Sequence, residues 1–102
     1  MHNQDNAMPI RKLARIIGKP GHGDQLRRAL IKLEEATRKE RGCIEFAFFQ
    51  AISDPDSFAL LEHFVDEPAL KLHMTLEHTR TFFSANAELI SAIKAIDIPS
   101  LR

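Results

Sequence analysis

The chain has 102 residues, of which 44% are hydrophobic and 27% are charged, a composition typical of a folded domain rather than of a disordered chain. Fourteen basic residues balance fourteen acidic ones, so no excess of positive charge favours nucleic acid or an anionic membrane as a partner. The single cysteine, Cys43, excludes an internal disulfide and a thiolate metal cluster. We therefore expect a cytoplasmic protein with neither nucleic-acid nor membrane partners.

The N-terminal residues 1–8, MHNQDNAM, are polar and lack the apolar core of a signal peptide. We expect them to form a flexible arm that precedes one folded domain over residues 9–102. The apolar segment Ile10–Ile17 predicts a first strand, and the glycine- and proline-rich residues 18–21 predict a turn.

Residues 22–41 have the periodicity of an amphipathic helix, with one stripe formed by Leu26, Leu30, Leu33 and Thr37. Asp24 in the first turn and the basic residues of the segment 38–41 in the last turn suit the helix dipole. Gly42 is the expected residue after the helix, because glycine readily takes the left-handed conformation there. The charged run 38–41 is interpreted as a solvated helix end.

Two predicted strands, 43–52 and 57–65, follow and are separated by the turn residues Ser53-Asp54-Pro55-Asp56. Both are apolar on both faces. In the first, the row of Ile44, Phe46 and Phe48 opposes the row of Cys43, Ala47 and Phe49. A sheet with one face in water would not need two apolar faces, so the pattern predicts that a partner covers the second face.

Asp66 is the expected N-cap of a short helix whose buried stripe is Ala69, Leu72, His73 and Leu76. Residues 79–89 predict another helical segment, and the alternation over 91–98 predicts a last strand. The order β-α-β-β-α-β predicts an α+β ferredoxin-like domain, in which helices cover one face of a four-stranded antiparallel sheet. Because the other face is apolar, we expect a homodimer in which two sheets pack face to face.

Two candidate catalytic residues are Glu62 and His73. Glu62 shares a strand face with large apolar residues, and a buried carboxylate needs a partner. His73 lies on the apolar stripe of its helix, and a neutral imidazole is the most suitable general base near pH 7. The two side chains can meet across a pocket, where Glu62 would orient His73. The alternatives are structural: Glu62 caps the next helix, or His73 is a hydrogen-bonded core histidine.

His78 lies five residues after His73, about 140° around an ideal helix, so the two share a face only if the helix breaks between them. We interpret His78 as a residue of the pocket mouth. Phe46, Phe64 and Phe82 are core residues that are also candidates for contact with a flat ligand. No metal is expected, because Glu62, His73 and His78 match no standard ligand spacing. Cys43 is interpreted as a buried, inert thiol.

Two stretches carry a resemblance to a known family, namely Glu40-Arg41-Gly42-Cys43-Ile44 and the run from Phe58 to Leu70, followed by His73 and His78. They resemble the E-x-G-C and F-x-L-x-E-x-W-x-D-x-x-A-L-x-x-H patterns of the antibiotic biosynthesis monooxygenases, with Phe64 in place of the tryptophan. The resemblance implies a dimeric α/β barrel. The haem-degrading branch of the family is disfavoured, because its strand-one asparagine and strand-three tryptophan are both missing.

The resemblance further implies a cofactor-independent monooxygenase that oxidises a small aromatic or quinol-type compound with dioxygen. His73 would take the phenol proton, and the resulting anion would reduce dioxygen directly, without cofactor or metal. One alternative is a small-ligand-binding or accessory dimer without catalysis, which the absence of Trp and Tyr favours. Another is a proton-transfer isomerase built on the same fold.

Overall fold

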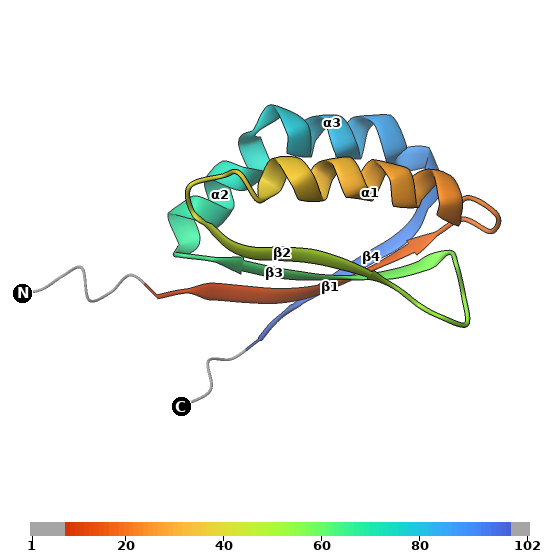
Figure 1. Ribbon diagram of the computed structural model, residues 1–102, viewed down its shortest axis with the longest axis horizontal. Coiled ribbons are helices and arrows are strands. Elements are labelled where there is room, and N and C mark those ends of the chain that lie inside the picture. Colours follow the sequence, from red (N-terminus) through yellow and green to blue (C-terminus); the bar gives the residue numbers. More distant parts are fainter. Residues whose placement is uncertain (1–7, 99–102) are drawn as a thin grey trace, which may run out of the picture.

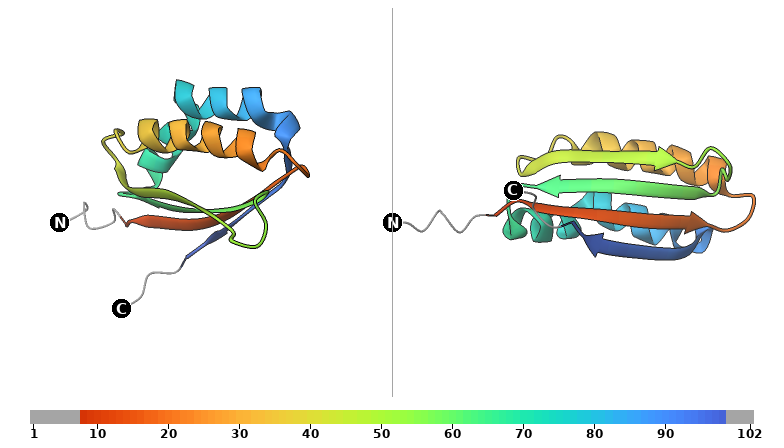
Figure 2. Two further views of the ribbon diagram at one scale, coloured as in Figure 1. Left: turned by 45° about the vertical axis from the view of Figure 1, so that its right-hand side comes forward. Right: turned by 90° about the horizontal axis from the view of Figure 1, so that it is seen from below.

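Four antiparallel strands form one sheet in the order β2-β3-β1-β4 in the computed structural model, which describes residues 8–98. The strands are β1 (Ile10–Gly18), β2 (Cys43–Gln50), β3 (Ser57–Phe64) and β4 (Ile90–Asp97). Within the described residues, all helices lie on one face of the sheet (Figure 1), and the opposite face carries none (Figure 2, right). The predicted α+β ferredoxin-like architecture is confirmed. Apart from Met8, the predicted N-terminal arm lies outside the described residues, as do residues 99–102 of the predicted domain.

Helix α1 (Gly23–Thr37) buries the predicted stripe against the sheet, with Leu26, Leu30, Leu33 and Thr37 all buried. The helix ends four residues earlier than the sequence predicted, and no basic residue lies in its last turn. Residues 38–42 instead form successive turns, in which the Glu40 N–H donates to the Thr37 carbonyl. Gly42 does not take the predicted left-handed backbone conformation, because Gly21, with φ 86°, is the only residue of 8–98 with a positive φ. Contacts of this turn with the second helical segment, described below, outweigh the local helix preference.

The second helical segment is broken in the middle. Helix α2 (Glu67–Thr75) starts at the predicted N-cap, where an Asp66 carboxylate oxygen accepts from the Ala69 N–H at 2.9 Å. Helix α3 (Glu77–Asn86) follows at once, because Leu76 between them has extended backbone angles, φ −73° and ψ 154°. A 3₁₀ turn, η2 (Ala87–Leu89), then leads into β4.

The face that α2 buries differs from the predicted stripe. His73 is its one fully buried residue, and Ala69 and Leu70 pack partly against the core. Leu72 is exposed, although the sequence placed it on the stripe. Successive helical residues point about 100° apart, so a helix that aims Ala69, Leu70 and His73 inward must turn Leu72 outward.

The hydrophobic core fills the layer between the helices and the sheet, and its buried residues are Ala14, Ile16, Leu26, Leu30, Leu33, Phe46, Phe58, Leu60, Phe64 and Phe82. One predicted strand face is wrong at its start, because Ile44 is exposed and Cys43 packs against the core. A β-bulge between Cys43 and Glu45 explains this. Cys43 pairs with Phe64 and Glu45 with the next residue, His63, so β2 contains one extra residue there and its alternation shifts by one. The predicted alternation of β2 therefore holds only from Phe46 onward.

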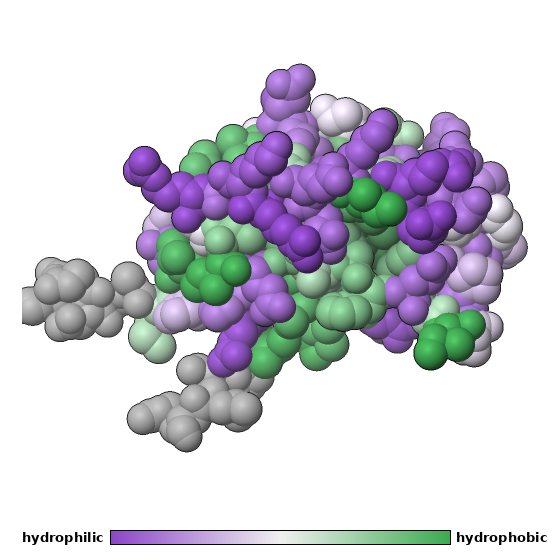
Figure 3. Space-filling model, in the orientation of Figure 1, coloured by the Kyte–Doolittle hydropathy of each residue, from purple (hydrophilic) through white to green (hydrophobic). Residues whose placement is uncertain are grey.

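Polarity differs between the two sides of the molecule. Charged and polar side chains cover much of the helix layer, whereas many hydrophobic side chains gather lower, towards the sheet (Figure 3). None of the helices within residues 8–98 has the length and apolar character needed to cross a membrane.

Candidate active site

A cavity of about 350 Å³ lies between the helix-facing side of the sheet and the helices. Its wall is mainly apolar, with Phe46, Phe48 and Leu60 from the sheet and Phe82 from α3 among its lining residues. Four polar side chains also line it, namely Lys12, Glu62, His73 and Thr79. An apolar cavity with a few polar groups directed to one place is typical of a small-molecule site.

His73 is held in the cavity wall by a carboxylate that the sequence did not identify as its partner. Its Nδ1 lies 2.8 Å from Oε2 of Glu40, and the His73 side chain is only 4% exposed. An ionised carboxylate can only accept a hydrogen bond, so Nδ1 of a neutral His73 carries the proton and Nε2 keeps its lone pair. The rings of Phe46 and Phe64 pack against the imidazole, with centroids 5.3 Å and 5.0 Å away.

His78 reaches the same carboxylate oxygen from the other side of the helix break. Its Nε2 lies 2.5 Å from Oε2 of Glu40. The two histidines could share a face only if the helix broke between them. The extended backbone at Leu76 is this break, because it separates α2 from α3. One oxygen of Glu40 therefore joins α2 and α3 to the turn after α1.

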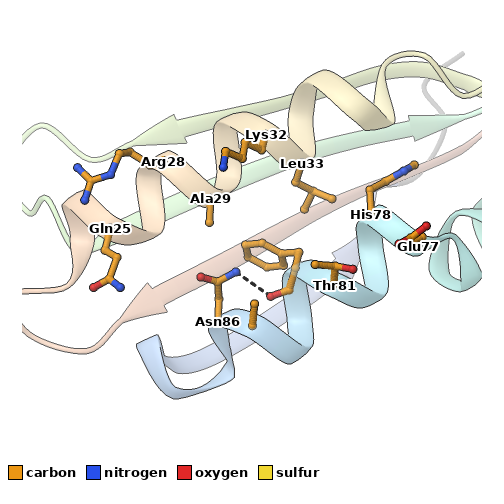
Figure 4. Close-up of a pocket in the computed structure, with 11 residues that line it drawn as sticks. Gln25, Arg28, Ala29, Lys32, Leu33, Glu77, His78, Thr81 and Asn86 are labelled. Atoms are coloured by element: carbon orange, nitrogen blue, oxygen red, sulfur yellow. Dashed lines mark hydrogen bonds between the residues drawn. The ribbon is translucent and has the colours of Figure 1, made fainter.

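His78 does not line the cavity that His73 lines. It stands at one end of a separate groove of about 700 Å³ between α1 and α3, where Figure 4 shows Arg28 and Lys32 of α1 across from Thr81 and Asn86 of α3. The floor of this groove includes Phe82, which also contributes to the cavity. The two spaces are thus neighbours that share Leu33 and Phe82 as lining residues.

Glu62 lies in the cavity on β3, directly across from Lys12 of β1 and Phe46 of β2. Burial raises the pKa of Glu62, and the charge of Lys12 opposes this effect in part. Lys12 donates to Oδ1 of Asp97 at 2.7 Å, and this hydrogen bond raises the pKa of Lys12. Glu62 is therefore a partly buried carboxyl group with a basic neighbour.

The predicted pairing of Glu62 with His73 is wrong. Both residues line the cavity, as their strand and helix faces implied, but the carboxylate bonded to His73 is that of Glu40, and no hydrogen bond within residues 8–98 joins Glu62 to His73. The physical reason is that the turn after α1 brings Glu40 against the imidazole, while Glu62 lies beside Lys12. Which of these groups acts in catalysis stays a prediction.

The remaining predicted site residues divide into two groups. Phe46 and Phe82 line the cavity, whereas Phe64 is fully buried beside His73 and is not part of the cavity wall. Cys43 is partly buried, and burial, with a smaller effect of the Glu40 charge, raises the pKa of its thiol to about 11. The thiol is therefore protonated at neutral pH, which disfavours it as a nucleophile.

Glu40 is the residue of the site that sequence reasoning missed. It opens the E-x-G-C pattern, but the helical periodicity before it led to its interpretation as a solvated helix end. Because α1 stops at Thr37, Glu40 instead lies in a turn that folds back onto α2. Lys12 was also missed, since the imperfect alternation of the first strand did not show on which face it lies.

Comparison with known proteins adds an independent observation. Residues 9–85 match the family model described as antibiotic biosynthesis monooxygenase. The chain is 32% identical over 60 residues to YcnE of Bacillus subtilis, a proposed monooxygenase, and 42% identical over 48 residues to the uncharacterized protein YjcS of the same organism. These alignments cover 59% and 47% of this chain, and they span 63% and 46% of the lengths of the two relatives.

Solved structures agree on the fold. The crystal structure of PA3566 from Pseudomonas aeruginosa superposes with a TM-score of 0.88 at 30% identity, covering 93% of this chain and 96% of that one. A Bacteroides thetaiotaomicron protein described as an antibiotic biosynthesis monooxygenase also gives a TM-score of 0.88, at 23% identity, covering 93% of this chain and 91% of that one. At that lower identity the likeness concerns the fold alone.

Proposed function

The chain belongs to the antibiotic biosynthesis monooxygenase family, and from this premise we propose that it is a cofactor-independent monooxygenase of a small quinol-type aromatic compound. The single observation that carries the proposal is the position of His73. Its imidazole stands in the wall of an apolar cavity and is fixed through Nδ1 by a carboxylate that is itself only 10% exposed. Such an arrangement suits a general base that works in a water-poor site.

The chemistry begins with proton transfer from a phenolic O–H of the substrate to Nε2 of His73. The resulting anion is electron-rich and passes one electron to dioxygen, and the two radicals combine to form a carbon–oxygen bond. The O–O bond then breaks. One oxygen atom stays in the product, which becomes a hydroxyquinone, and the other leaves as water, so dioxygen supplies the whole oxidising capacity.

The other cavity residues have separate roles in this proposal. Phe46 and Phe82 offer apolar surfaces to an aromatic ring, and a cavity of about 350 Å³ suits a compound of one or two rings. Burial raises the pKa of Glu62 and so favours its protonated form, and in that form the carboxyl group would donate a hydrogen bond to a second oxygen of the substrate. Lys12 beside it favours an anionic substrate.

We further propose that the working form is a homodimer. One row of side chains crosses the bare face of the sheet, and the registers place in it Ala47, Leu61, Leu13 and Ile96, one from each strand. Ile96 is 62% exposed, and Phe49 nearby on β2 is 56% exposed. A row of apolar side chains that crosses all four strands suits a second copy of the chain better than water.

Oxygen uptake tests the proposal. The protein is mixed with a panel of benzene and naphthalene quinols in an oxygen-electrode cell, and the rate of each quinol in buffer is subtracted. We expect at least one quinol to be oxidised faster than in buffer, and His73→Ala to lower that rate at least a hundredfold, the usual contribution of a general base. His22→Ala, which removes an exposed histidine, is the matched control.

Two results would contradict the proposal. If no quinol of the panel is oxidised faster with the protein than in buffer alone, the binding or accessory dimer without catalysis is favoured. A full rate in His73→Ala would remove His73 from the reaction.

A further inference from the structure

Glu40, His73 and His78 form a cluster that contains the usual donor atoms of a transition-metal site. We propose that this cluster binds one divalent ion of the late first-row metals, such as Zn²⁺ or Ni²⁺, and that the bound ion inhibits the proposed oxidation. The inhibitory part rests on the proposed function of His73, whereas the binding part does not.

The geometry needs little adjustment to hold an ion. One ligand atom from each residue lies within 4.8 Å of the others. The two imidazole nitrogens lie 2.8 Å and 2.5 Å from Oε2 of Glu40. Around a tetrahedral Zn²⁺ with bonds near 2.1 Å, neighbouring ligand atoms are about 3.4 Å apart, so each nitrogen needs to move away from the Glu40 oxygen by less than about 1 Å. The two nitrogens lie no more than 4.8 Å apart and need to approach each other by less than about 1.5 Å.

Charge also favours a cation at this place. The Glu40 carboxylate is 10% exposed, and within residues 8–98 its ion-pair partners are the two imidazoles, with no lysine or arginine among them. Two imidazoles that share one carboxylate oxygen do not give it the full countercharge that a lysine or arginine would, and a carboxylate with little exposure favours a cation beside it. A divalent ion in place of the two shared protons supplies this countercharge.

The cluster can be reached from solvent and leaves room for a further ligand. The His78 side chain is 27% exposed and stands at the end of the groove between α1 and α3 (Figure 4). Two histidines and one carboxylate leave the fourth position of a tetrahedral ion to water. Two histidines and one carboxylate are also a frequent donor set for divalent transition metals in proteins.

Binding of the ion changes what His73 offers to the cavity. In the metal-free site Nδ1 carries the proton and donates it to Glu40. An ion on Nδ1 replaces that proton, so the neutral ring must carry its proton on Nε2 instead. A protonated Nε2 cannot accept a proton from a phenol, and the same histidine therefore cannot be metal ligand and general base at once.

Metal titration tests the binding. The chain is freed of metal with EDTA, dialysed, and titrated with Co²⁺, followed by visible absorption, and with Zn²⁺, followed by calorimetry. We expect one ion per chain in the wild type and in the control His22→Ala, and at least tenfold weaker binding in His78→Ala and His78→Gln. Circular dichroism shows that the variants are folded. Equal affinity in the folded His78 variants, or no saturable binding, would overturn the proposal.

Oxygen uptake with and without the ion separates this proposal from the proposed function. Saturable binding to a protein that oxidises no quinol supports the site and contradicts the function. Oxidation of a quinol by a protein that binds no ion supports the proposed function and contradicts the metal site. If both occur, Zn²⁺ should slow the oxidation with the concentration dependence of its binding, and stimulation by Zn²⁺ would overturn the inhibitory role.

Discussion

Glu40 connects the candidate site at the scale of single residues. One oxygen of its carboxylate, Oε2, accepts hydrogen bonds from both His73 and His78. The bond from His73 determines which nitrogen of that ring keeps a lone pair. The proposed base therefore depends on a residue that need not touch the substrate. Glu40 is a positioning residue in this account, whereas Glu62 lies in the cavity wall itself.

Substitution of Glu40 tests this positioning role. We expect Glu40→Gln to lower kcat/KM at least tenfold, about 1.4 kcal/mol in the barrier, because an amide can hold Nδ1 as donor or acceptor and so mixes the tautomers. The double variant with His73→Ala should be about as slow as His73→Ala alone, as for residues that act as a unit. Glu35→Gln, at an exposed position of α1, is the control.

The ¹⁵N spectrum of His73 gives a readout that a merely structural role of Glu40 does not change. The wild type should contain the Nδ1–H tautomer, and Glu40→Gln a mixture. Additive rate losses together with an unchanged tautomer would contradict the positioning role.

Glu62 should make stability depend on pH. Its folded-state pKa lies above the ordinary value of 4.5, so the folded chain binds more protons than the unfolded chain between these two pKa values. The free energy of unfolding therefore falls as pH rises through that window, and the charge of Lys12 opposes only part of this effect. We expect Glu62→Gln to melt higher than the wild type at pH 7 and to lose this advantage below about pH 4.5.

Melting temperatures of both proteins over a pH series measure the effect. Glu45→Gln, which alters an exposed carboxylate on β2, should show no such crossover. A constant difference between Glu62→Gln and the wild type at every pH would mean that the charge of Glu62 is not the cause.

Among the elements, the turn between α1 and β2 decides where Glu40 points. Gly42 at its end packs so closely on α2 that an added Cβ would stand 2.5 Å from the Cβ of Ala69. The Gly42 carbonyl also accepts from the Val65 N–H at 2.9 Å, which ties the turn to the end of β3. The absence of a side chain, rather than a left-handed conformation, is what Gly42 contributes.

A paired substitution tests this contact. Gly42→Ala should cost about 1–3 kcal/mol of unfolding free energy, the usual cost of overpacking, because neither backbone-anchored methyl group can move away alone. Ala69→Gly costs about 1 kcal/mol by helix propensity but makes room for the new methyl group. In urea unfolding, the double variant should therefore be more stable than the sum of the single changes by at least about 1 kcal/mol. Strict additivity would show that the two residues do not press on each other.

Sequence periodicity predicted the order and type of the elements because the apolar stripe of α1 has a clear helical period and the segments around it do not. Strand and helix period also placed Glu62 and His73 towards one cavity, which both residues line. It failed where a tertiary contact overrides a local pattern: α1 stops at Thr37, and the bulge in β2 turns Ile44 outward. The partner of His73 depends on where α1 ends, because Glu40 reaches His73 only from the turn that follows Thr37. No spacing rule could therefore identify Glu40 as that partner.

For the whole molecule, the bare face of the sheet is the feature that needs a partner. A row of Ala47, Leu61, Leu13 and Ile96 crosses all four strands on the side without helices (Figure 2, right). Two copies with their sheets face to face would remove this row from water and form the dimeric barrel that the resemblance implies.

Sedimentation at micromolar concentration measures the association directly. We expect about twice the chain mass of 11.6 kDa for the wild type. Leu61→Asp, which places a charge in the middle of the row, should shift the protein to monomer. Ile31→Asp, at an exposed position of α1, should leave the dimer intact. A wild-type monomer at these concentrations would contradict the dimer.

The central claim is that this chain, without a metal or other cofactor, inserts one atom of dioxygen into a quinol, and isotope labelling tests it most directly. EDTA-treated protein is supplied with the best quinol of the panel under ¹⁸O₂, and the product is analysed by mass spectrometry. The account predicts one labelled oxygen atom in each hydroxyquinone, and loss of this product in His73→Ala. An unlabelled product, or one labelled only when the water carries ¹⁸O, would contradict it.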